Sequence, residues 1–227
     1  EFKKVKLIGV LLASFILLIS CLIRAYRWKL LIEPLDKLTL RHVFSATMIG
    51  YFGNGVLAFR LGELLKAYSL SQKSNITTTQ AFGTVILERL LDIITLLIIF
   101  LVLLPWFPFE YEILKYSAIG FSIFSLIAIV MLFVFTKFNF WKKNKRFRYN
   151  SSKSIKKIYL LLFSILEGLT SLKKNRSSYY IIVLSIVIWC IYLFETVIII
   201  KACNLDFSII EAGILLIVGS IALGIPA

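Results

Sequence analysis

The stretch that decides the fold covers residues 50–92. It reads GYFGNGVLAFRLGELLKAYSL (50–70), a polar loop containing QKSNITTT (72–79), and AFGTVILERLLD (81–92). In the two apolar parts of this stretch, 50–70 and 81–92, seven side chains are charged or carry an amide: Asn54, Arg60, Glu63, Lys66, Glu88, Arg89 and Asp92. Ionisable groups at bilayer depth are costly and usually face a bundle interior or a wet cavity. The stretch therefore indicates a functional path. The alternative is that Arg60 and Glu63 lie in a surface loop, while Arg89 and Asp92 neutralise each other.

The composition around this stretch is that of a membrane protein. The chain has 227 residues, of which 59% are hydrophobic, and its mean hydropathy is +0.90. Several apolar runs approach the ~20 residues that a helix needs to cross a bilayer. Because these runs are continuous rather than alternating, they favour helices over the strands of a barrel. The sequence predicts an all-α, polytopic transmembrane bundle, organised as one domain over residues 1–227.

About six membrane segments are expected, at 5–23, 40–59, 80–104, 115–135, 179–200 and 211–227. The second is unusual, because Gly50, Gly53 and Gly55 surround Asn54. Glycine permits close backbone approach and non-helical dihedral angles. This segment either spans the membrane, or enters, unwinds near residues 53–55 and returns, which is allowed where backbone is buried in protein or lines water.

Three residues after the first segment are expected to anchor it at the membrane interface: Arg24, Arg27 and Trp28. Arg24 and Trp28 are four residues apart on one helical face, so a contact between guanidinium and indole is the alternative. Glu33-Pro34 is expected to end the helix. Glu195 interrupts the 179–200 segment; it either faces inward or reaches the interface.

The segment at 80–104 carries its charges near its middle. Glu88 and Asp92 share a helical face, and Arg89 precedes Asp92 by three residues, which allows an ion pair within the helix. A carboxylate that faces lipid would be expensive. We therefore expect this face to point inward, toward Arg60 or Asn54.

The net charge of +14 is concentrated between the apolar segments. Residues 137–176 contain twelve Lys and Arg against the single acid Glu167, which by the positive-inside rule places this loop in the cytoplasm. Apolar residues at helical spacing over 155–169 predict an amphipathic helix at the interface. This charge favours anionic lipid over nucleic acid as a partner. If the 40–59 segment spans, the N-terminus is cytoplasmic, which we favour; if it re-enters, the N-terminal lysines are outside.

A weak internal repeat is suggested by a shift of 168 residues. It superposes the first segment on 179–200 and the Gly-rich 40–58 on 208–226, although chance similarity between apolar segments is the alternative. Paired interrupted segments of this kind occur in transporters, with the binding site between the repeats.

Three groups of residues together resemble the lysylphosphatidylglycerol synthase transmembrane region family, also described as the flippase-like domain. They are Arg24 and Arg27-Trp28, then Asn54 followed by Arg60-Leu61-Gly62-Glu63, then Glu88-Arg89-Leu90 with Asp92. There are two departures. Ala58 stands near the place of the family's usual proline, which makes a broken helix less expected. The chain also stops at Pro226-Ala227, where the family continues, so we expect it to be a fragment.

The resemblance implies a membrane domain that carries a charged or glycosylated phospholipid or polyprenyl-phosphate lipid between leaflets. Arg60, and Arg89 deeper in the groove, would hold the lipid phosphate, because guanidinium suits bidentate phosphate contact. The carboxylates of Glu63, Glu88 and Asp92 would balance those arginines in the empty site or contact the headgroup. The resemblance and the Lys- and Ile-rich composition imply a bacterial inner membrane, with a partner transferase and an oligomer as open options.

Two other classes of function remain open. The chain could be the membrane part of a lipid-modifying aminoacyl- or glycosyltransferase, or a scaffold that uses its charges for helix packing. No nucleotide-binding glycine loop and no Ser–His or metal constellation supports catalysis or a cofactor. His42 is the only histidine, and Cys21, Cys190 and Cys203 have no metal-binding spacing.

Overall fold

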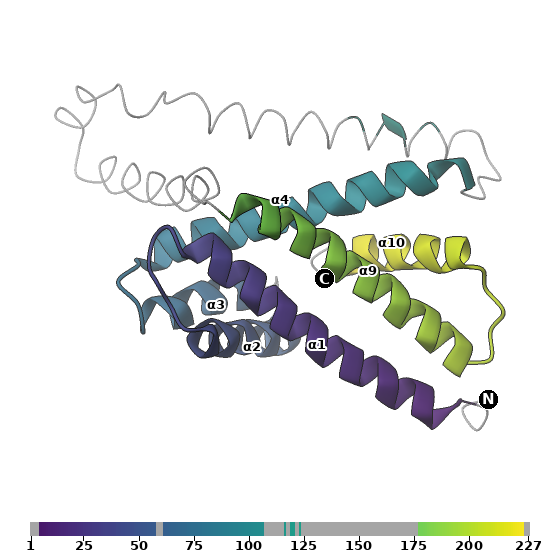
Figure 1. Ribbon diagram of the computed structural model, residues 1–227, viewed down its shortest axis with the longest axis horizontal. Helices are drawn as coiled ribbons and strands as arrows, with labels where there is room; N and C mark the ends of the chain where they lie inside the picture. The colour runs from purple at the N-terminus through teal and green to yellow at the C-terminus, as the bar shows by residue number, and fades with distance from the viewer. Residues whose placement is uncertain are drawn as a thin grey trace.

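The structure is a computed structural model that describes residues 5–57, 61–106, 116, 119–120, 123 and 177–224. Of these, residues 221–224 are described by their backbone alone. Regular structure in these residues is entirely helical, as predicted (Figure 1). The elements are α1 (Leu7–Ile32), α2 (Leu40–Val56), α3 (Gly62–Ser71), α4 (Thr78–Leu103), the 3-10 turn η3 (Leu104–Trp106), α9 (Ser178–Ala202) and α10 (Ile209–Gly224). The predictions for Arg60, for most of 115–135, for the 137–176 loop and for the amphipathic helix over 155–169 lie outside the described residues.

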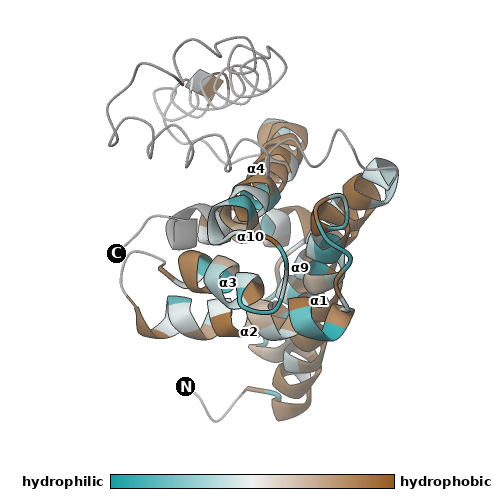
Figure 2. Cartoon of the chain, turned by 90° about the vertical axis from the view of Figure 1, so that its left-hand side faces the viewer, coloured by the Kyte–Doolittle hydropathy of each residue, from teal (hydrophilic) through white to brown (hydrophobic). Residues whose placement is uncertain are grey.

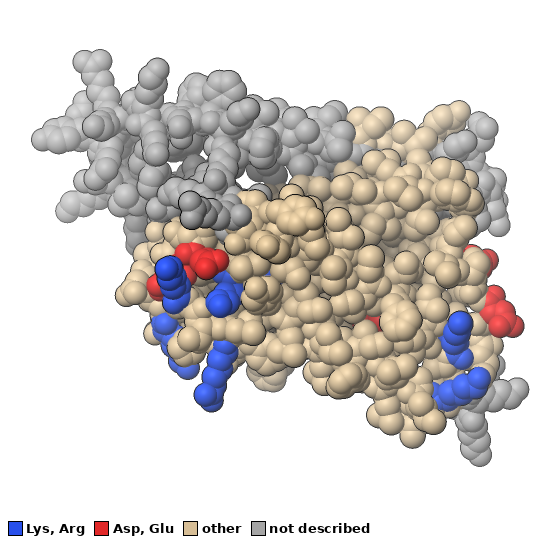
Figure 3. Space-filling view, viewed as in Figure 1, with Lys and Arg blue, Asp and Glu red and all other residues tan. Residues whose placement is uncertain are grey.

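Two of the described helices, α1 and α9, are long and apolar enough to cross a membrane. They pack antiparallel, since the backbone N–H of Lys6 donates to the carbonyl of Ala202 at 2.9 Å. Much of the outward surface of α1 and α9 is exposed apolar side chain, and it is mostly brown in Figure 2. Figure 3 shows charged side chains gathered at both ends of the visible face and a wide belt between them that is almost free of charge. This distribution suits a bundle surrounded by lipid.

Helix α1 extends nine residues beyond the predicted segment and ends at Ile32. The predicted stop is confirmed, because Glu33 is the C-cap and its N–H donates to the carbonyl of Lys29 at 3.0 Å. The interface role predicted for Arg24, Arg27 and Trp28 is wrong. All three are buried within the helix, and Arg27 and Trp28 have no exposed surface. The end of the apolar run at Ile23 marks the start of a buried polar face, not the end of the helix.

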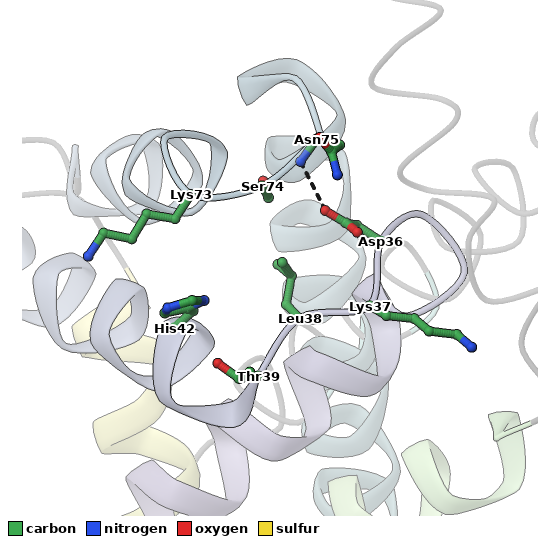
Figure 4. Close-up of a pocket in the computed structure, with 8 residues that line it drawn as sticks. All are labelled: Asp36, Lys37, Leu38, Thr39, His42, Lys73, Ser74 and Asn75. Carbon is green, nitrogen blue, oxygen red and sulfur yellow. Dashed lines mark hydrogen bonds between the residues drawn. The ribbon is translucent and has the colours of Figure 1, made fainter.

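Helices α2 and α3 form a hairpin whose two ends lie together. The carboxylate of Asp36, before α2, accepts a hydrogen bond of 2.9 Å from the backbone N–H of Asn75, after α3. Figure 4 shows this bond beside a pocket of about 380 Å³ that His42 and Lys73 also line. The chain therefore enters along α2 and returns along α3. This hairpin agrees with a chain that enters and returns, and the side of the membrane on which the N-terminus lies stays a prediction.

The unwinding at residues 53–55 that the re-entrant alternative included is absent. Helix α2 is regular through Val56, and the N–H of Leu57 caps it by donating to the carbonyl of Gly53 at 2.8 Å. The glycines serve close approach instead. A Cβ atom on Gly62 would collide with the carbonyl oxygen of Gly50 and with Asn54, and one on Gly53 would lie 2.9 Å from the Cα of Gly62. The hairpin thus has room for backbone only where α2 crosses the start of α3.

A hydrophobic core lies at the end of the bundle where α1 ends and α4 begins. Buried side chains from α1, α2, α3, α4 and α9 meet there, among them Trp28, Ile32, Val43, Val85 and Ile181. The polar loop before α4 provides its capping residues. Thr77 accepts from the backbone N–H of Gln80, and the Gln80 side chain accepts from the N–H of Thr77. These two hydrogen bonds satisfy backbone N–H groups at the start of α4.

The suggested repeat agrees with the helix bounds. A shift of 168 residues places α2 (Leu40–Val56) on residues 208–224, and α10 covers Ile209–Gly224. The shifted α1 likewise overlaps α9. Because α1 and α9 run antiparallel, the two units have opposite directions, which is the relation found in inverted repeats.

Candidate functional site

The candidate site is a buried network of seven charged side chains from three helices, called here the ion network. Its members are Arg24 and Arg27 from α1, Glu63 and Lys66 from α3, and Glu88, Arg89 and Asp92 from α4. Asp92 is the fifteenth of the 26 residues of α4, so the network lies near the middle of that helix, about 20 Å from its start.

Asp92 joins the two arginines of α1. Its Oδ2 accepts from Arg24 Nη2 and its Oδ1 from Arg27 Nη2, both at 2.7 Å. Charge-assisted bonds of this length are among the strongest that side chains form. Arg24 also donates to the Tyr51 hydroxyl at 3.3 Å, and Arg27 donates to the Ser185 hydroxyl at 2.9 Å. This carboxylate therefore connects α4 to α1, and through the arginines to α2 and α9.

Glu88 performs the same role for α3. Its Oε2 accepts from Lys66 Nζ at 2.6 Å, and its Oε1 lies 3.6 Å from Arg27 Nη2. The Lys66 ammonium also lies 4.1 Å from the centre of the Trp28 ring. The Trp28 indole N–H in turn donates to Thr84 Oγ1 at 3.0 Å. With both side chains almost fully buried, Glu88 and Lys66 fix the hairpin against α4.

Arg89 and Glu63 form the accessible edge of the network. The two side chains are ion-paired, and 32% of the Arg89 side chain and 16% of the Glu63 side chain are exposed. The predicted pair between Arg89 and Asp92 is present at 3.6 Å, but the shorter bonds of Asp92 go to α1. A ligand would reach Arg89 and Glu63 before any other member of the network.

Several polar atoms of this region have no hydrogen-bond partner among the described residues. They are the Nε atoms of Arg24, Arg27 and Arg89, the Oε2 of Glu63, the Oε1 of Glu88 and the Oδ1 of Asn54. Buried polar groups are normally paired, so unmet capacity of this extent is unusual for a purely structural cluster. It is the capacity that a polar ligand or bound water would use.

The structure brings together most of the predicted site residues. Glu63, Glu88, Arg89 and Asp92 meet as predicted, and Asn54 lies against Gly62 at the tip of the hairpin. The inward direction of the Glu88–Asp92 face is confirmed, but its observed partners are Arg24, Arg27 and Lys66. Arg60 lies outside the described residues.

Two secondary predictions have different outcomes. The contact between Arg24 and Trp28, given as an alternative, is not formed: Arg24 lies 5.6 Å from the Tyr192 ring centre, while Lys66 faces Trp28. Glu195 is half-buried, and no ion pair joins it to the network in the described part of the chain. Sequence reasoning missed Tyr51 and Ser185 as partners of the arginines. Ser185 lies 158 residues from Arg27, and no local pattern signals such a pair.

These features define an α-helical integral membrane protein with an ion network inside its bundle and the α2–α3 hairpin beside that network. The chain belongs to the family described as the lysylphosphatidylglycerol synthase TM region, whose model matches residues 2–227. That membership confirms the resemblance and links the chain to lipid handling.

A curated relative is the UPF0104 membrane protein MJ1595 of Methanocaldococcus jannaschii, which is 29% identical over 133 residues. The match covers 56% of this chain and 40% of the relative, so the chain spans well under two thirds of that relative's length. No solved structure matches the chain.

Proposed function

We propose that this domain binds the phosphate of a membrane lipid at the ion network and moves that lipid between leaflets. The observation that carries the proposal is the charge of the network. In the described residues it holds four cations, Arg24, Arg27, Lys66 and Arg89, against the three carboxylates of Glu63, Glu88 and Asp92. An unbalanced charge at bilayer depth is expensive, and an anion would remove that cost.

Within the network the two kinds of ion pair have different roles. The deep bonds to Asp92 and Glu88 hold α1, α3 and α4 together, and they have little exposed surface. The Arg89–Glu63 pair is the most exposed of the ion pairs, with 32% and 16% of the two side chains exposed, so it contributes less to stability than the deep pairs. A lipid phosphate can therefore replace the Glu63 carboxylate on the guanidinium of Arg89 at small cost. Guanidinium is suited to this exchange because it binds phosphate and carboxylate with the same paired N–H groups.

Arg60 would add to this site from the hairpin. It falls between Leu57 and Leu61, the described residues that flank the tip, and Glu63 in the first turn of α3 already contacts Arg89. The short distance along the chain from Arg60 to Glu63 supports a role for Arg60 as a second phosphate ligand. The lipid class that we propose, from the resemblance to the family, is a charged or glycosylated phospholipid or polyprenyl phosphate.

We also propose an orientation. The end of the bundle where α1 ends and α4 begins, called here the basic end, carries Lys29, Lys37, Arg41 and Lys73. Helix α9 begins at this end, because Ile181 packs in the core there, so the twelve Lys and Arg of 137–176 lead into it. The positive-inside rule then makes the basic end cytoplasmic and the N-terminus external. A bacterial inner membrane remains the expected location.

The test is a transfer assay with the full-length protein in vesicles that contain labelled anionic phospholipid. Arg89→Gln and Arg60→Ala should each reduce leaflet-to-leaflet transfer, and Glu88→Gln should reduce it as well. Loss of one charge-assisted contact, about 1.5–3 kcal/mol, corresponds to roughly ten- to a hundredfold. Arg41→Gln is the matched control, because Arg41 is exposed at the basic end and outside the network. Normal transfer by well-folded Arg89→Gln and Arg60→Ala proteins would refute the proposal.

A further inference from the structure

The strongest feature outside the ion network is a cavity of about 630 Å³ between α4, α9 and α10. It lies within the range of roughly 300–1,000 Å³ that ligand pockets occupy. Its lining is almost wholly apolar and includes Leu91 and Ile99 of α4, Leu193 of α9 and Leu216 of α10. The shape and chemistry of this space suit a hydrocarbon chain.

The cavity borders the ion network at Ser185. Ser185 lines the cavity, and its hydroxyl accepts the hydrogen bond from Arg27 Nη1 at 2.9 Å. On the facing helix, Leu91 lines the cavity and is followed directly by Asp92. One end of the apolar space therefore abuts buried charge, as a site for an amphiphile requires.

Trp189 supplies a polar group in the cavity wall. Its side chain lines the cavity one helical turn after Ser185, and the residue is only 6% exposed. The indole Nε1 has no hydrogen-bond partner among the described residues. A buried indole N–H usually finds an acceptor, so an oxygen from a bound molecule is expected beside it.

The length and direction of the cavity also fit a lipid. Along α4 it extends from Leu91 to Leu103, about 18 Å. That is close to the ~15 Å occupied by one leaflet of a 30 Å hydrocarbon core. Leu103 and Ile209 lie toward the end of the bundle opposite the basic end, so the cavity runs away from the ion network in that direction.

We infer that this cavity holds an acyl or prenyl chain of the lipid whose phosphate binds the ion network, and that Trp189 donates a hydrogen bond to an oxygen of the lipid's linkage region. This inference rests on the proposed lipid binding and adds where the chain lies. The bound lipid has its phosphate nearer the basic end and its chain nearer the opposite end. That is the orientation of a lipid from the leaflet at the basic end.

The experiment is photolabelling of the full-length protein in vesicles, using a phospholipid with a diazirine at the end of one acyl chain. Labelled peptides are identified by mass spectrometry. Saturable labelling is expected on cavity residues of α4, α9 and α10, displaced by unlabelled lipid. Ile99→Trp, which fills the cavity, should reduce this labelling at least tenfold. Leu101→Trp is the matched control, because Leu101 lies on the same helix, is 44% exposed and does not line the cavity.

A second variant tests the hydrogen bond. Trp189→Phe keeps a buried ring but lacks the N–H, so the lipid concentration for half-maximal labelling should rise about three- to tenfold, the effect of one hydrogen bond. Labelling spread evenly over outward residues, or unchanged in the Ile99→Trp protein, would overturn the inference. These results differ from failure of the proposed function, in which cavity labelling persists but no lipid crosses between leaflets.

Discussion

Exchange of Asp92 for Asn separates the structural part of the ion network from its ligand-binding part. The substitution keeps the shape of the side chain and removes its charge. Arg24 and Arg27 then lose the carboxylate that accepts a 2.7 Å bond from each of them. Both guanidinium groups are buried, so neither can turn to water for compensation.

The expected magnitude follows from this burial. Removing one partner of a buried ion pair costs about 3–5 kcal/mol, because an uncompensated charge remains inside. That is a large part of the roughly 5–15 kcal/mol that stabilises a folded domain. For a chain of this size each kcal/mol corresponds to about 2–4 °C, so Asp92→Asn should lower Tm by roughly 6–20 °C.

The comparison is Arg89→Gln, which changes the accessible pair. With 32% of its side chain exposed and a partner that is also partly exposed, Arg89 should contribute about 0–1 kcal/mol to stability. Thermal unfolding of both full-length variants in detergent gives the two Tm values, and the vesicle assay gives lipid transfer. Arg89→Gln should keep nearly the parental Tm and lose transfer.

Two results would refute this reasoning. If the Asp92→Asn protein has the same Tm as the parental protein, the buried network does not hold the helices together. If Arg89→Gln is destabilised as strongly as Asp92→Asn, the accessible pair is structural, and the scaffold function gains support over lipid binding.

Three further predictions follow from the hairpin and its neighbours. Gly62→Ala should destabilise the fold by about 1–3 kcal/mol through collision with α2, whereas Gly55→Ala, in open space, should be neutral or stabilising; equal Tm values would contradict this. Trp28→Phe should lower the free energy of unfolding by about 1–3 kcal/mol in chemical denaturation, because the buried Thr84 hydroxyl loses its donor. An unchanged denaturation midpoint would contradict this prediction. Cysteines at Lys37 and Lys73 should react with an impermeant thiol reagent from the same side of the membrane. Reaction from opposite sides would show that the 40–59 segment spans.

The helical fold could be predicted because its causes are local. Continuous apolar runs predicted the membrane helices, and Glu33-Pro34 predicted the end of α1. Each of these signals depends on residues a few positions apart. These local signals therefore do not depend on contacts with distant parts of the chain.

The partners in the site could be predicted only in part. The carboxylates of Glu88 and Asp92 required buried cations, but two of those cations, Arg24 and Arg27, looked like interface anchors because an apolar run ends just before them. A usable signal was present: Arg24, Arg27 and Leu31 share a helical face, and the chain to Ile32 contains good helix formers. No local sequence pattern indicates a distant partner such as Ser185.

The choice between a spanning and a re-entrant segment was beyond the sequence for a geometric reason. Helix α2 has 17 residues, a length of about 25 Å that suits either path. What decides it is the return of α3, fixed by the contact of Gly62 with α2 and by the bond from Asn75 to Asp36. Both contacts join segments whose pairing no periodicity encodes.

The returning hairpin also alters the barrier that a lipid headgroup meets. Glu63, in the first turn of α3, contacts Arg89 about 17 Å along α4, so in the proposed orientation the hairpin reaches only about halfway across the bilayer from the basic end. A phosphate bound there, as we propose, would have about 15 Å of hydrocarbon ahead of it instead of 30 Å. The hydrocarbon barrier at this point would be thinner than that of the surrounding membrane. In the proposed function, binding at the tip would therefore take a charged headgroup through about half of its crossing.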